Sequence, residues 1–206
     1  MAFDGSLIRK IGRNIVLPTD KIKTICRKAL AGRDIRTVLD FGAGTLFWTD
    51  WFIQEFGSDV YAVDTCYDNF TMSINEKITC YSDLYICLEK NAHFSLVWAC
   101  DVLHHLSYSD SDVFFEKICD KTNILIIKDI DANHSFGEFM NKIHDKVING
   151  ETTYRIFPEK LTDYFESQGF ETSYYYVPKI WYPHFVLIAI RKGNYTFDKQ
   201  GIRNEK

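Results

Sequence analysis

Long apolar runs are missing from this 206-residue sequence, and so is the apolar core of a secretory signal peptide at its N-terminus. Residues 185–190 are among the longest apolar stretches, and they are far too few to span a bilayer. Internal repeats and low-complexity segments are also missing. We therefore expect a cytoplasmic protein without a membrane segment, in which the glycosylation-type motifs at Asn69 and Asn194 carry no weight.

Cysteine is present, but not in a metal-binding pattern. The six cysteines form no CxxC pair, and none has a histidine at metal-ligand spacing. Most lie in apolar stretches, where a free cysteine behaves as a small hydrophobic residue. We expect no metal site and interpret all six as reduced core residues: Cys26, Cys66, Cys80, Cys87, Cys100 and Cys119.

A strong excess of positive charge is missing as well. The net charge of -4 argues against a dedicated nucleic-acid-binding protein, so we expect no nucleic-acid partner. The segment up to Arg36 is nevertheless basic, and only Asp4, Asp20 and Asp34 oppose its positive charges. This pattern is typical of a solvated helix face, and the alternative is a basic lip that attracts an anionic substrate. The basic residues are Arg9, Lys10, Arg13, Lys21, Lys23, Arg27, Lys28, Arg33 and Arg36.

The composition is that of an ordinary globular protein, with 46% hydrophobic and 25% charged residues. The length suits one domain with a sizeable core. We divide it into a helical extension over residues 1–34, a core over 35–192 and a polar tail over 193–206. Aromatic residues reach 16%, which suggests a ligand pocket lined with rings.

Strand and helix patterns alternate along the core. Apolar runs predict strands over residues 37–39, 60–63, 78–81, 94–100, 123–127, 172–177 and 185–190. Helices are predicted over 19–30, after the glycines that follow the first strand up to Phe56, and over 84–90, 110–119, 135–147 and 158–169, with a weaker one at 69–74. Pro178 and Pro183 bracket a short connection, so the last two strands pair antiparallel. The pattern predicts an α/β fold: a doubly wound, mostly parallel seven-stranded sheet with its last strand antiparallel and helices on both faces.

Two helix starts carry residues that favour capping. Thr19 or Asp20 is expected to cap the first helix, because short oxygen-bearing side chains accept hydrogen bonds from free N–H groups. Residues 110–112, an Asp-Ser-Asp sequence, are expected to cap the helix that ends at Cys119.

The junction after the first strand is the most informative segment. Val38 and Leu39 belong to the strand, Asp40 follows, and Gly42 and Gly44 come before an apolar helix. Glycine tolerates positive φ and lets backbone approach a ligand, and the helix N-terminus offers free N–H groups at the same place. The pattern favours a ligand site over a plain turn.

Further polar residues follow the other predicted strands. In a doubly wound sheet, ligands bind beyond the carboxyl ends of the parallel strands, so these side chains should meet at one edge. The set consists of Asp40, Gly42 and Gly44; Asp64; Ser82 and Asp83; Asp101, His104 and His105; and Lys128 and Asp129.

Four segments together resemble class I S-adenosylmethionine (SAM)-dependent methyltransferases. Residues 38–44 match the first motif of that family, and residues 60–64 match its second strand with the terminal acid. Residues 100–106 match a fourth-strand motif, and the final helix and strand pair resemble the reversed last strand. Each match is weak alone, but the ordered set spans residues 35–191 and is specific.

The resemblance implies SAM as the cofactor and assigns roles in the first two motifs. Gly42 and Gly44 would let the loop pass under the methionine part of SAM, with Phe41 beside them. Asp40 would help to hold the ammonium group, and Asp64 would accept hydrogen bonds from both ribose hydroxyls, since a carboxylate has two acceptor oxygens. The alternative for the two acids is that they cap loops.

The resemblance also implies that Ser82 and Asp83 lie near the adenine, and that Asp101 and Val102 lie beside the sulfonium. The chain departs from the family at Leu46, where a third glycine is usual, so cofactor affinity is expected to be slightly weaker. A dinucleotide-binding GxGxxG loop is the competing interpretation, but it needs glycine at Phe47.

Methyl transfer needs mainly alignment of its reactants, and an oxygen nucleophile also benefits from a base. His104 and His105 are the candidate bases, because histidine titrates near neutral pH; the alternative is that one of them packs or caps the next helix. Lys128 could bind a phosphate or carboxylate of the substrate, or it could pair with Asp129 or Asp101.

Two further hypotheses concern the surroundings of this edge. Metal-assisted O-methylation would use Asp101, Asp129 and Asp131 as ligands, but Lys128 beside them opposes a cation. Residues 148–158 lie where the family builds a substrate lid. An aromatic-walled acceptor pocket is expected there, and its candidate rings are Tyr154, Phe157, Tyr174, Tyr175, Tyr176, Trp181 and Tyr182.

From the sequence we expect a SAM-dependent methyltransferase that acts on an O or N atom of a small molecule. A sugar-type or phosphorylated biosynthetic intermediate is favoured, because the chain has little beyond its core to grip a large partner. The alternatives are an RNA or protein methyltransferase, or an inactive SAM-binding interaction module supported only by Leu46. The acceptor and the oligomeric state do not follow from the sequence.

Overall fold

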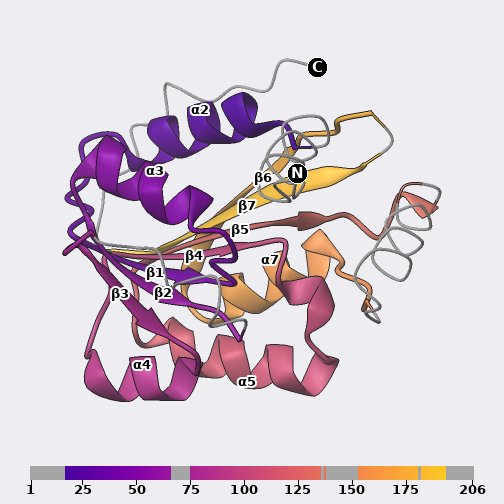
Figure 1. Cartoon of the computed structure of the whole chain (residues 1–206). Helices are drawn as coiled ribbons and strands as arrows, with labels where there is room; N and C mark the ends of the chain where they lie inside the picture. Colours follow the sequence, from indigo (N-terminus) through magenta and orange to yellow (C-terminus); the bar gives the residue numbers. More distant parts are fainter. Residues whose placement is uncertain (1–16, 66–74, 136, 138–152, 181, 194–206) are drawn as a thin grey trace, which may run out of the picture.

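The computed structural model describes residues 17–65, 75–135, 137, 153–180 and 182–193 (Figure 1). The strands are β1 Thr37–Phe41, β2 Asp59–Val63, β3 Ile78–Tyr81, β4 Leu96–Cys100, β5 Ile124–Ile130, β6 Phe170–Tyr176 and β7 His184–Arg191. The helices are α2 Thr19–Leu30, α3 Phe47–Phe56, α4 Leu84–Lys90, α5 Tyr108–Cys119 and α7 Pro158–Ser167, with a 3-10 turn, η2, at Leu103–His105. The predicted helices at 69–74 and 135–147, the tail and the first sixteen residues lie largely or wholly outside the described residues.

The seven strands form one sheet in the order β3-β2-β1-β4-β5-β7-β6. Neighbours from β3 to β5 pair in parallel, whereas β7 pairs antiparallel with both β5 and β6. This arrangement confirms the predicted doubly wound sheet with a reversed last strand. The strand order reverses direction between β1 and β4, and at such a point the carboxyl ends of an open α/β sheet leave a crevice.

Helices cover both faces of the sheet, as predicted (Figure 1). Successive strand residues point to opposite faces, so one strand feeds two cores. Val38 of β1 packs with α2 and α3 on one face, and Leu39 packs with α4, α5 and α7 on the other. All five residues of β4 are buried, as expected of a central strand with both faces covered.

The ends of several elements differ from the sequence prediction, and strand β1 runs on to Phe41, so that Asp40 lies within it. Pro18 is the N-cap residue of α2, and neither Thr19 nor Asp20 makes the predicted cap. Helix α5 begins earlier than predicted, because the Ser107 hydroxyl accepts the hydrogen bond from the backbone N–H of Asp110. Strand β5 runs on to Ile130, so Lys128 and Asp129 lie within the strand and not after it.

The described cysteines are free thiols and match the interpretation as core residues, apart from Cys80, which is half-buried. Burial raises the pKa of the Cys87 and Cys119 thiols to about 11, so both stay protonated at neutral pH. Cys66 lies outside the described residues. Among the helices that are described, none is both long and apolar enough to cross a bilayer.

Candidate cofactor and catalytic site

The loop after β1 is tied to the end of β2 by three backbone N–H groups. Gly42 and Ala43 donate to the carbonyl of Val63 at 2.9 and 3.1 Å, and Gly44 donates to Oδ2 of Asp64 at 2.8 Å. Both glycines have positive φ, 75° and 51°, which glycine adopts without a Cβ penalty. The structure therefore brings together the first two predicted motifs and uses the Asp64 carboxylate to hold the loop.

Asp40 is 1% exposed and accepts a hydrogen bond of 2.5 Å from the hydroxyl of Thr49 in the first turn of α3. Burial raises the pKa of Asp40 to about 7, although the hydrogen bond from Thr49 opposes the rise. A carboxyl group in this state is poised to ionise when a positive group comes close. Sequence reasoning missed Thr49, because a threonine inside an apolar helix gives no signal that its hydroxyl faces the preceding strand.

Leu46 adopts the left-handed conformation, with φ 60° and ψ 19°, at the N-cap position of α3. Its side chain is 8% exposed and packs with Ala43 and Ala62. The position thus has the backbone conformation that glycine favours, and leucine occupies it without moving the start of α3. The left-handed conformation explains why glycine is expected at this position. The packing of the leucine side chain offsets the cost of that conformation.

The structure also describes three other predicted cofactor residues, Phe41, Ser82 and Asp83. Phe41 stacks on Phe114 of α5, with ring centroids 4.4 Å apart. Asp83 caps α4 by accepting from the N–H of Ile86 at 3.0 Å, and Ser82 beside it is exposed. Their predicted roles near the adenine stay predictions, since the cap occupies only one oxygen of Asp83.

Val102 lies directly against Gly42. A Cβ atom on Gly42 would lie 2.6 Å from Cβ of Val102, so only glycine fits beneath this side chain. The contact places the segment after β4 against the loop after β1, although Gly42 and Val102 lie sixty positions apart in the sequence. The fourth-strand motif and the first motif therefore form one site.

Asp101 has a positive φ of 51° and binds Lys128 of β5 in two ways. Its backbone N–H donates to the carbonyl of Lys128 at 2.8 Å, and both carboxylate oxygens accept from Nζ at 2.5 and 2.6 Å. Lys128 is fully buried. Burial alone would raise the pKa of Asp101, but the ammonium of Lys128, with His184 and His104 nearby, holds it below its usual value. Of the open alternatives for Lys128, the structure shows the pair with Asp101, and a role in catalysis stays a prediction.

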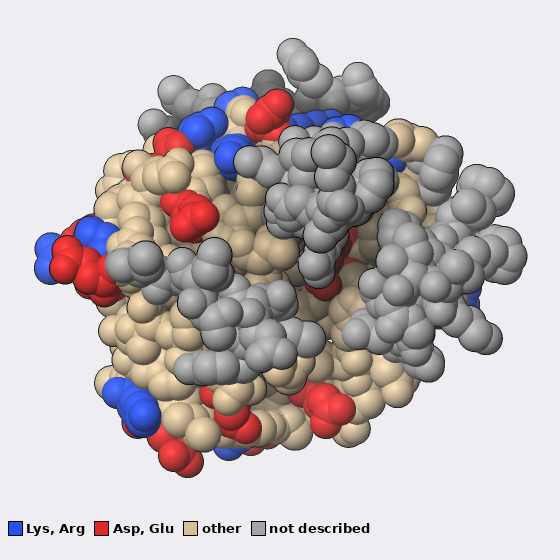
Figure 2. Space-filling model, viewed as in Figure 1, with Lys and Arg blue, Asp and Glu red and all other residues tan. Residues whose placement is uncertain are grey.

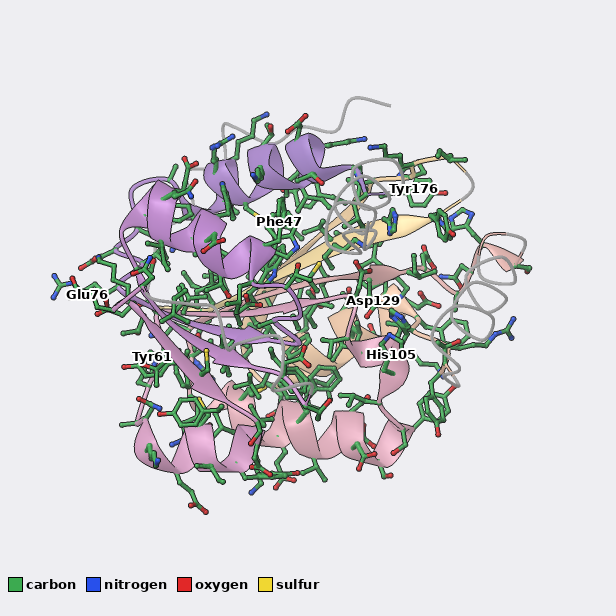
Figure 3. All side chains as sticks on the ribbon, in the orientation of Figure 1. Phe47, Tyr61, Glu76, His105, Asp129 and Tyr176 are labelled. Atoms are coloured by element: carbon green, nitrogen blue, oxygen red, sulfur yellow. The ribbon has the colours of Figure 1, made fainter. Side chains whose placement is uncertain are left out.

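His104 lies on η2 and is 5% exposed, whereas His105 is half-buried. The two rings pack with centroids 4.1 Å apart. Nδ1 of His104 lies 2.5 Å from Oδ1 of Asp129, which is fully buried in β5. Figure 3 labels Asp129 together with His105, the next residue after His104 in η2. The sequence predicted that these residues share one edge of the sheet, but it could not show which histidine would contact the Asp129 carboxylate.

Asp101, His104 and Asp129 also bring three possible metal-ligand atoms within 4.8 Å of one another. Both oxygens of Asp101 are bound by Lys128, and both oxygens of Asp129 accept N–H groups. Asp131, the third ligand of the metal hypothesis, accepts from Tyr174 and from the N–H of Asn133 instead. A cation would have to compete with these donors for the carboxylate oxygens.

The predicted lid and aromatic wall are described only in part. The N–H of Tyr154 donates to the carbonyl of His104 at 2.7 Å, so the described part of the predicted lid contacts η2 at this residue. Tyr174 lines a cavity of about 350 Å³ together with Asp131, Asn133 and Pro158. Trp181 lies outside the described residues.

The basic residues of α2 are largely engaged with their own surroundings. Arg27 pairs with Glu55 at 2.6 Å, and Nζ of Lys23 lies 5.0 Å from the ring centre of Phe47. Figure 2 shows acidic side chains among the lysines and arginines at this end of the molecule. These contacts are those of the solvated helix face, and Arg9, Lys10 and Arg13 lie outside the described residues.

The residues present fit SAM. Gly42 leaves a space that a Cβ would fill, Gly44 and Asp64 form a fixed loop edge, and the buried carboxyl of Asp40 can stabilise an ammonium group. These features lie at the carboxyl ends of β1 and β2, which are neighbours in the sheet.

Comparison with known proteins agrees with the fold and identifies the family. A family model described as "Methyltransferase domain" matches residues 16–174. A SAM-dependent methyltransferase from Archaeoglobus fulgidus is similar in structure over 89% of this chain and 99% of its own, with 14% identity and a TM-score of 0.68. No functionally curated protein matches the chain in sequence.

Two further solved structures share the fold and contain S-adenosylhomocysteine. Magnesium protoporphyrin IX methyltransferase from Synechocystis PCC 6803 is 16% identical, with a TM-score of 0.61, over 84% of this chain and 82% of its own. A 1,6-didemethyltoxoflavin-N1-methyltransferase from Burkholderia thailandensis is 17% identical, with a TM-score of 0.63, over 82% and 75%. With the family model covering most of its length, the chain belongs to the methyltransferase-domain family and is a SAM-dependent methyltransferase of the class I fold.

Proposed function

We propose that this enzyme methylates an O or N atom of a small molecule, such as a sugar-type or phosphorylated biosynthetic intermediate. The observation that carries the proposal is a cluster of polar side chains at the segment that carries Val102, which packs on Gly42. In this cluster Lys128 pairs with Asp101, and His104 binds Asp129. Such a cluster suits a polar acceptor group close to the cofactor loop.

Similar structures support a small-molecule acceptor. The Burkholderia enzyme is named for 1,6-didemethyltoxoflavin and the Synechocystis enzyme for magnesium protoporphyrin IX. The basic lip that would favour an anionic acceptor has weaker support, because Arg27 and Lys23 already have partners within the chain. We therefore infer a polar acceptor and leave its net charge open to the screen described below.

We infer the roles of the site residues from the family resemblance and from their contacts. When bound, SAM supplies a methyl group on a sulfonium, which is already activated for attack. The loop at Gly42 and Gly44 would hold its methionine part, with Asp40 at the ammonium and Asp64 at the ribose. His104 would take up a proton of the acceptor.

Calorimetric titration with S-adenosylhomocysteine tests cofactor binding. We expect the wild-type protein to bind it and NADH not to bind, and we expect Asp64→Ala to lose most of the affinity. Asp59→Ala is the matched control. Asp59 is exposed and begins strand β2, whereas Asp64 directly follows the other end of that strand. Equal affinity in the wild type and Asp64→Ala would contradict the assigned cofactor site.

An acceptor screen tests the substrate class. Formation of S-adenosylhomocysteine is followed with hydroxyl compounds, amines, phosphorylated sugars and bulk transfer RNA. Turnover with a small molecule supports the proposal. Turnover only with RNA, or firm cofactor binding with no turnover in any class, would overturn it in favour of an RNA methyltransferase or a binding module.

A further inference from the structure

Asp129 has three hydrogen-bond partners although its side chain is fully buried. The backbone N–H of Leu103 donates to Oδ2 at 3.1 Å. The backbone N–H of Ile130 and Nδ1 of His104 both reach Oδ1, at 2.7 and 2.5 Å. Each oxygen therefore already serves as an acceptor for a backbone donor whose role cannot change.

This geometry fixes the proton on the His104 ring. Each oxygen of Asp129 accepts a backbone N–H, which favours the ionised carboxylate, and an ionised carboxylate can only accept hydrogen bonds. Nδ1 of the His104 ring must therefore be the donor. In the neutral ring the lone pair then lies on Nε2. Asp129 thus selects one tautomer of His104 and also fixes the orientation of the ring, as a carboxylate partner does for other functional histidines.

The pair lies within the proposed site. Turn η2 contacts β5 and begins directly after Val102, whose side chain lies against Gly42. His104 also lies close enough to Asp101 to lower the pKa of that carboxyl. The ring therefore lies against β5, on the turn that follows the residue in contact with the cofactor loop.

We propose that Asp129 is a positioning residue that holds His104 with its proton on Nδ1, so that Nε2 is the base for methylation of a hydroxyl group. This inference rests on the proposed function. A neutral amine needs only its lone pair, whereas a hydroxyl must lose a proton, so a built base favours the oxygen acceptor.

The reaction is then balanced as follows. The acceptor oxygen forms a bond to the methyl carbon while the carbon–sulfur bond breaks, and that electron pair stays on sulfur, which becomes a neutral thioether. The hydroxyl proton passes to Nε2 of His104. The resulting imidazolium keeps Nδ1–H on Asp129, whose carboxylate stabilises the positive charge.

The same three side chains raise a competing hypothesis, a divalent cation held by Asp101, His104 and Asp129. A cation on Asp129 would have to compete with its N–H donors, and a cation on Asp101 would have to bind against the positive charge of Lys128. The base and the metal site therefore predict different protonation of the His104 ring, since a metal on Nδ1 excludes the proton there.

Nuclear magnetic resonance of the full chain labelled with nitrogen-15 histidine tests the inference without an acceptor. The signals that disappear in His104→Gln are those of His104. At pH 8 we expect Nδ1 to be protonated and Nε2 to be unprotonated. Asp129→Asn places an amide NH₂ against one of the N–H donors, so it should shift or abolish the Nδ1–H signal. Asp131→Asn, the same change two residues further on, should leave the His104 signals unchanged.

Several outcomes would overturn the inference. A wild-type ring protonated on Nε2, or a His104 spectrum unaffected by Asp129→Asn, contradicts the positioning role. If Asp129→Asn does not fold, the wild-type spectrum still decides between the two tautomers. Stoichiometric shifts of the His104 signals on titration with Mg²⁺ or Zn²⁺ would replace the base with a metal site.

Turnover of a hydroxyl acceptor from the screen adds a kinetic test. We expect Asp129→Asn to lower kcat by about 10²-fold and to leave S-adenosylhomocysteine binding unchanged, because proton transfer contributes rate and not cofactor affinity. Unchanged turnover in that variant, or turnover with amines alone, contradicts the inference while leaving the methyltransferase function intact. If the wild-type protein does not bind S-adenosylhomocysteine, the proposed function itself is contradicted.

Discussion

The side chain of Val102 lies so close to Gly42 that a Cβ atom at residue 42 would be 2.6 Å from Cβ of the valine. Gly42 also has φ 75°, which costs an L-residue about 1–2 kcal/mol. Overpacking typically adds about 1–3 kcal/mol. We expect Gly42→Ala to lower the free energy of unfolding by about 3 kcal/mol, measured by urea denaturation, and to weaken S-adenosylhomocysteine binding in calorimetry.

Gly32 provides the matched control for this prediction. Its φ is 72°, but nothing lies within 4 Å of a Cβ placed there. Gly32→Ala should therefore show only the backbone cost, about 1–2 kcal/mol. Equal losses in the two variants would mean that Val102 does not press on Gly42.

The order and class of the elements could be predicted from local signals. Continuous apolar runs and glycine-punctuated helices are properties of neighbouring residues, so β1 to β7 and their helices were all expected. The end of β5 could not be predicted, because Lys128 and Asp129 are polar. They stay in the strand because the antiparallel ladder with β7 continues to the pair of Ile130 and His184.

The start of α5 shows a second limit. Ser107, Ser109, Asp110 and Ser111 can all cap a helix, so composition leaves the first residue undecided. Turn η2 just before them ends at His105 and delivers the chain to Ser107 in an extended conformation, with ψ 161°. The cap is therefore selected by the preceding turn and not by local preference.

For the site, strand ends predicted which residues share an edge but not which of them pair. Lys128 with Asp101 and His104 with Asp129 are contacts between residues more than twenty positions apart. Such pairs depend on the register of β4 against β5 and on the path of η2, neither of which a single sequence contains. The roles assigned to the site residues and the boundaries of the three predicted chain segments stay predictions.

Asp40 should make stability depend on pH. Its pKa is about 7 in the folded protein against 3.8 as the ordinary value, because burial disfavours the charge. The folded state therefore keeps a proton that the unfolded state has released, and stability falls as pH rises from about 4 to 7. Relative to Asp40→Asn, the wild type should lose up to about 4 kcal/mol across this range, measured by urea denaturation at several pH values.

Asparagine is a suitable reference, since its carbonyl oxygen can still accept from Thr49 while the ionisation is removed. Other carboxyl groups titrate equally in both proteins and cancel in the difference. A difference between the two proteins that does not change with pH would contradict a raised pKa for Asp40.

Leu46 should reverse the usual order of alanine and glycine. Both Leu46→Ala and Leu46→Gly remove a side chain that is 8% exposed, so both should be less stable than the wild type, by about 2–5 kcal/mol for alanine. Glycine, however, also relieves the left-handed backbone at φ 60°. We expect Leu46→Gly to be more stable than Leu46→Ala by about 1 kcal/mol in urea denaturation. Alanine equal to or better than glycine would rule out this conformation.

Lys128 should be needed for stability at neutral pH more than at acidic pH. Replacing the fully buried lysine with methionine leaves the Asp101 carboxylate without its ammonium partner, which typically costs about 3–5 kcal/mol. Burial would then raise the pKa of Asp101, so protonation relieves the penalty as the pH falls. In the wild type the pair holds that pKa low, and its contribution is lost only below the usual value of 3.8.

The gap between the wild type and Lys128→Met should therefore be large at pH 7 and shrink towards pH 4 in urea denaturation. Adding Asp101→Asn to Lys128→Met removes the stranded charge, so the double variant should be more stable than Lys128→Met alone. A lysine that served mainly to bind substrate would behave differently: Lys128→Met would weaken acceptor binding with little loss of stability at any pH. The direct contact of Nζ with both oxygens of Asp101 favours the first result, because no carboxylate in that position can lose its counter-charge without cost.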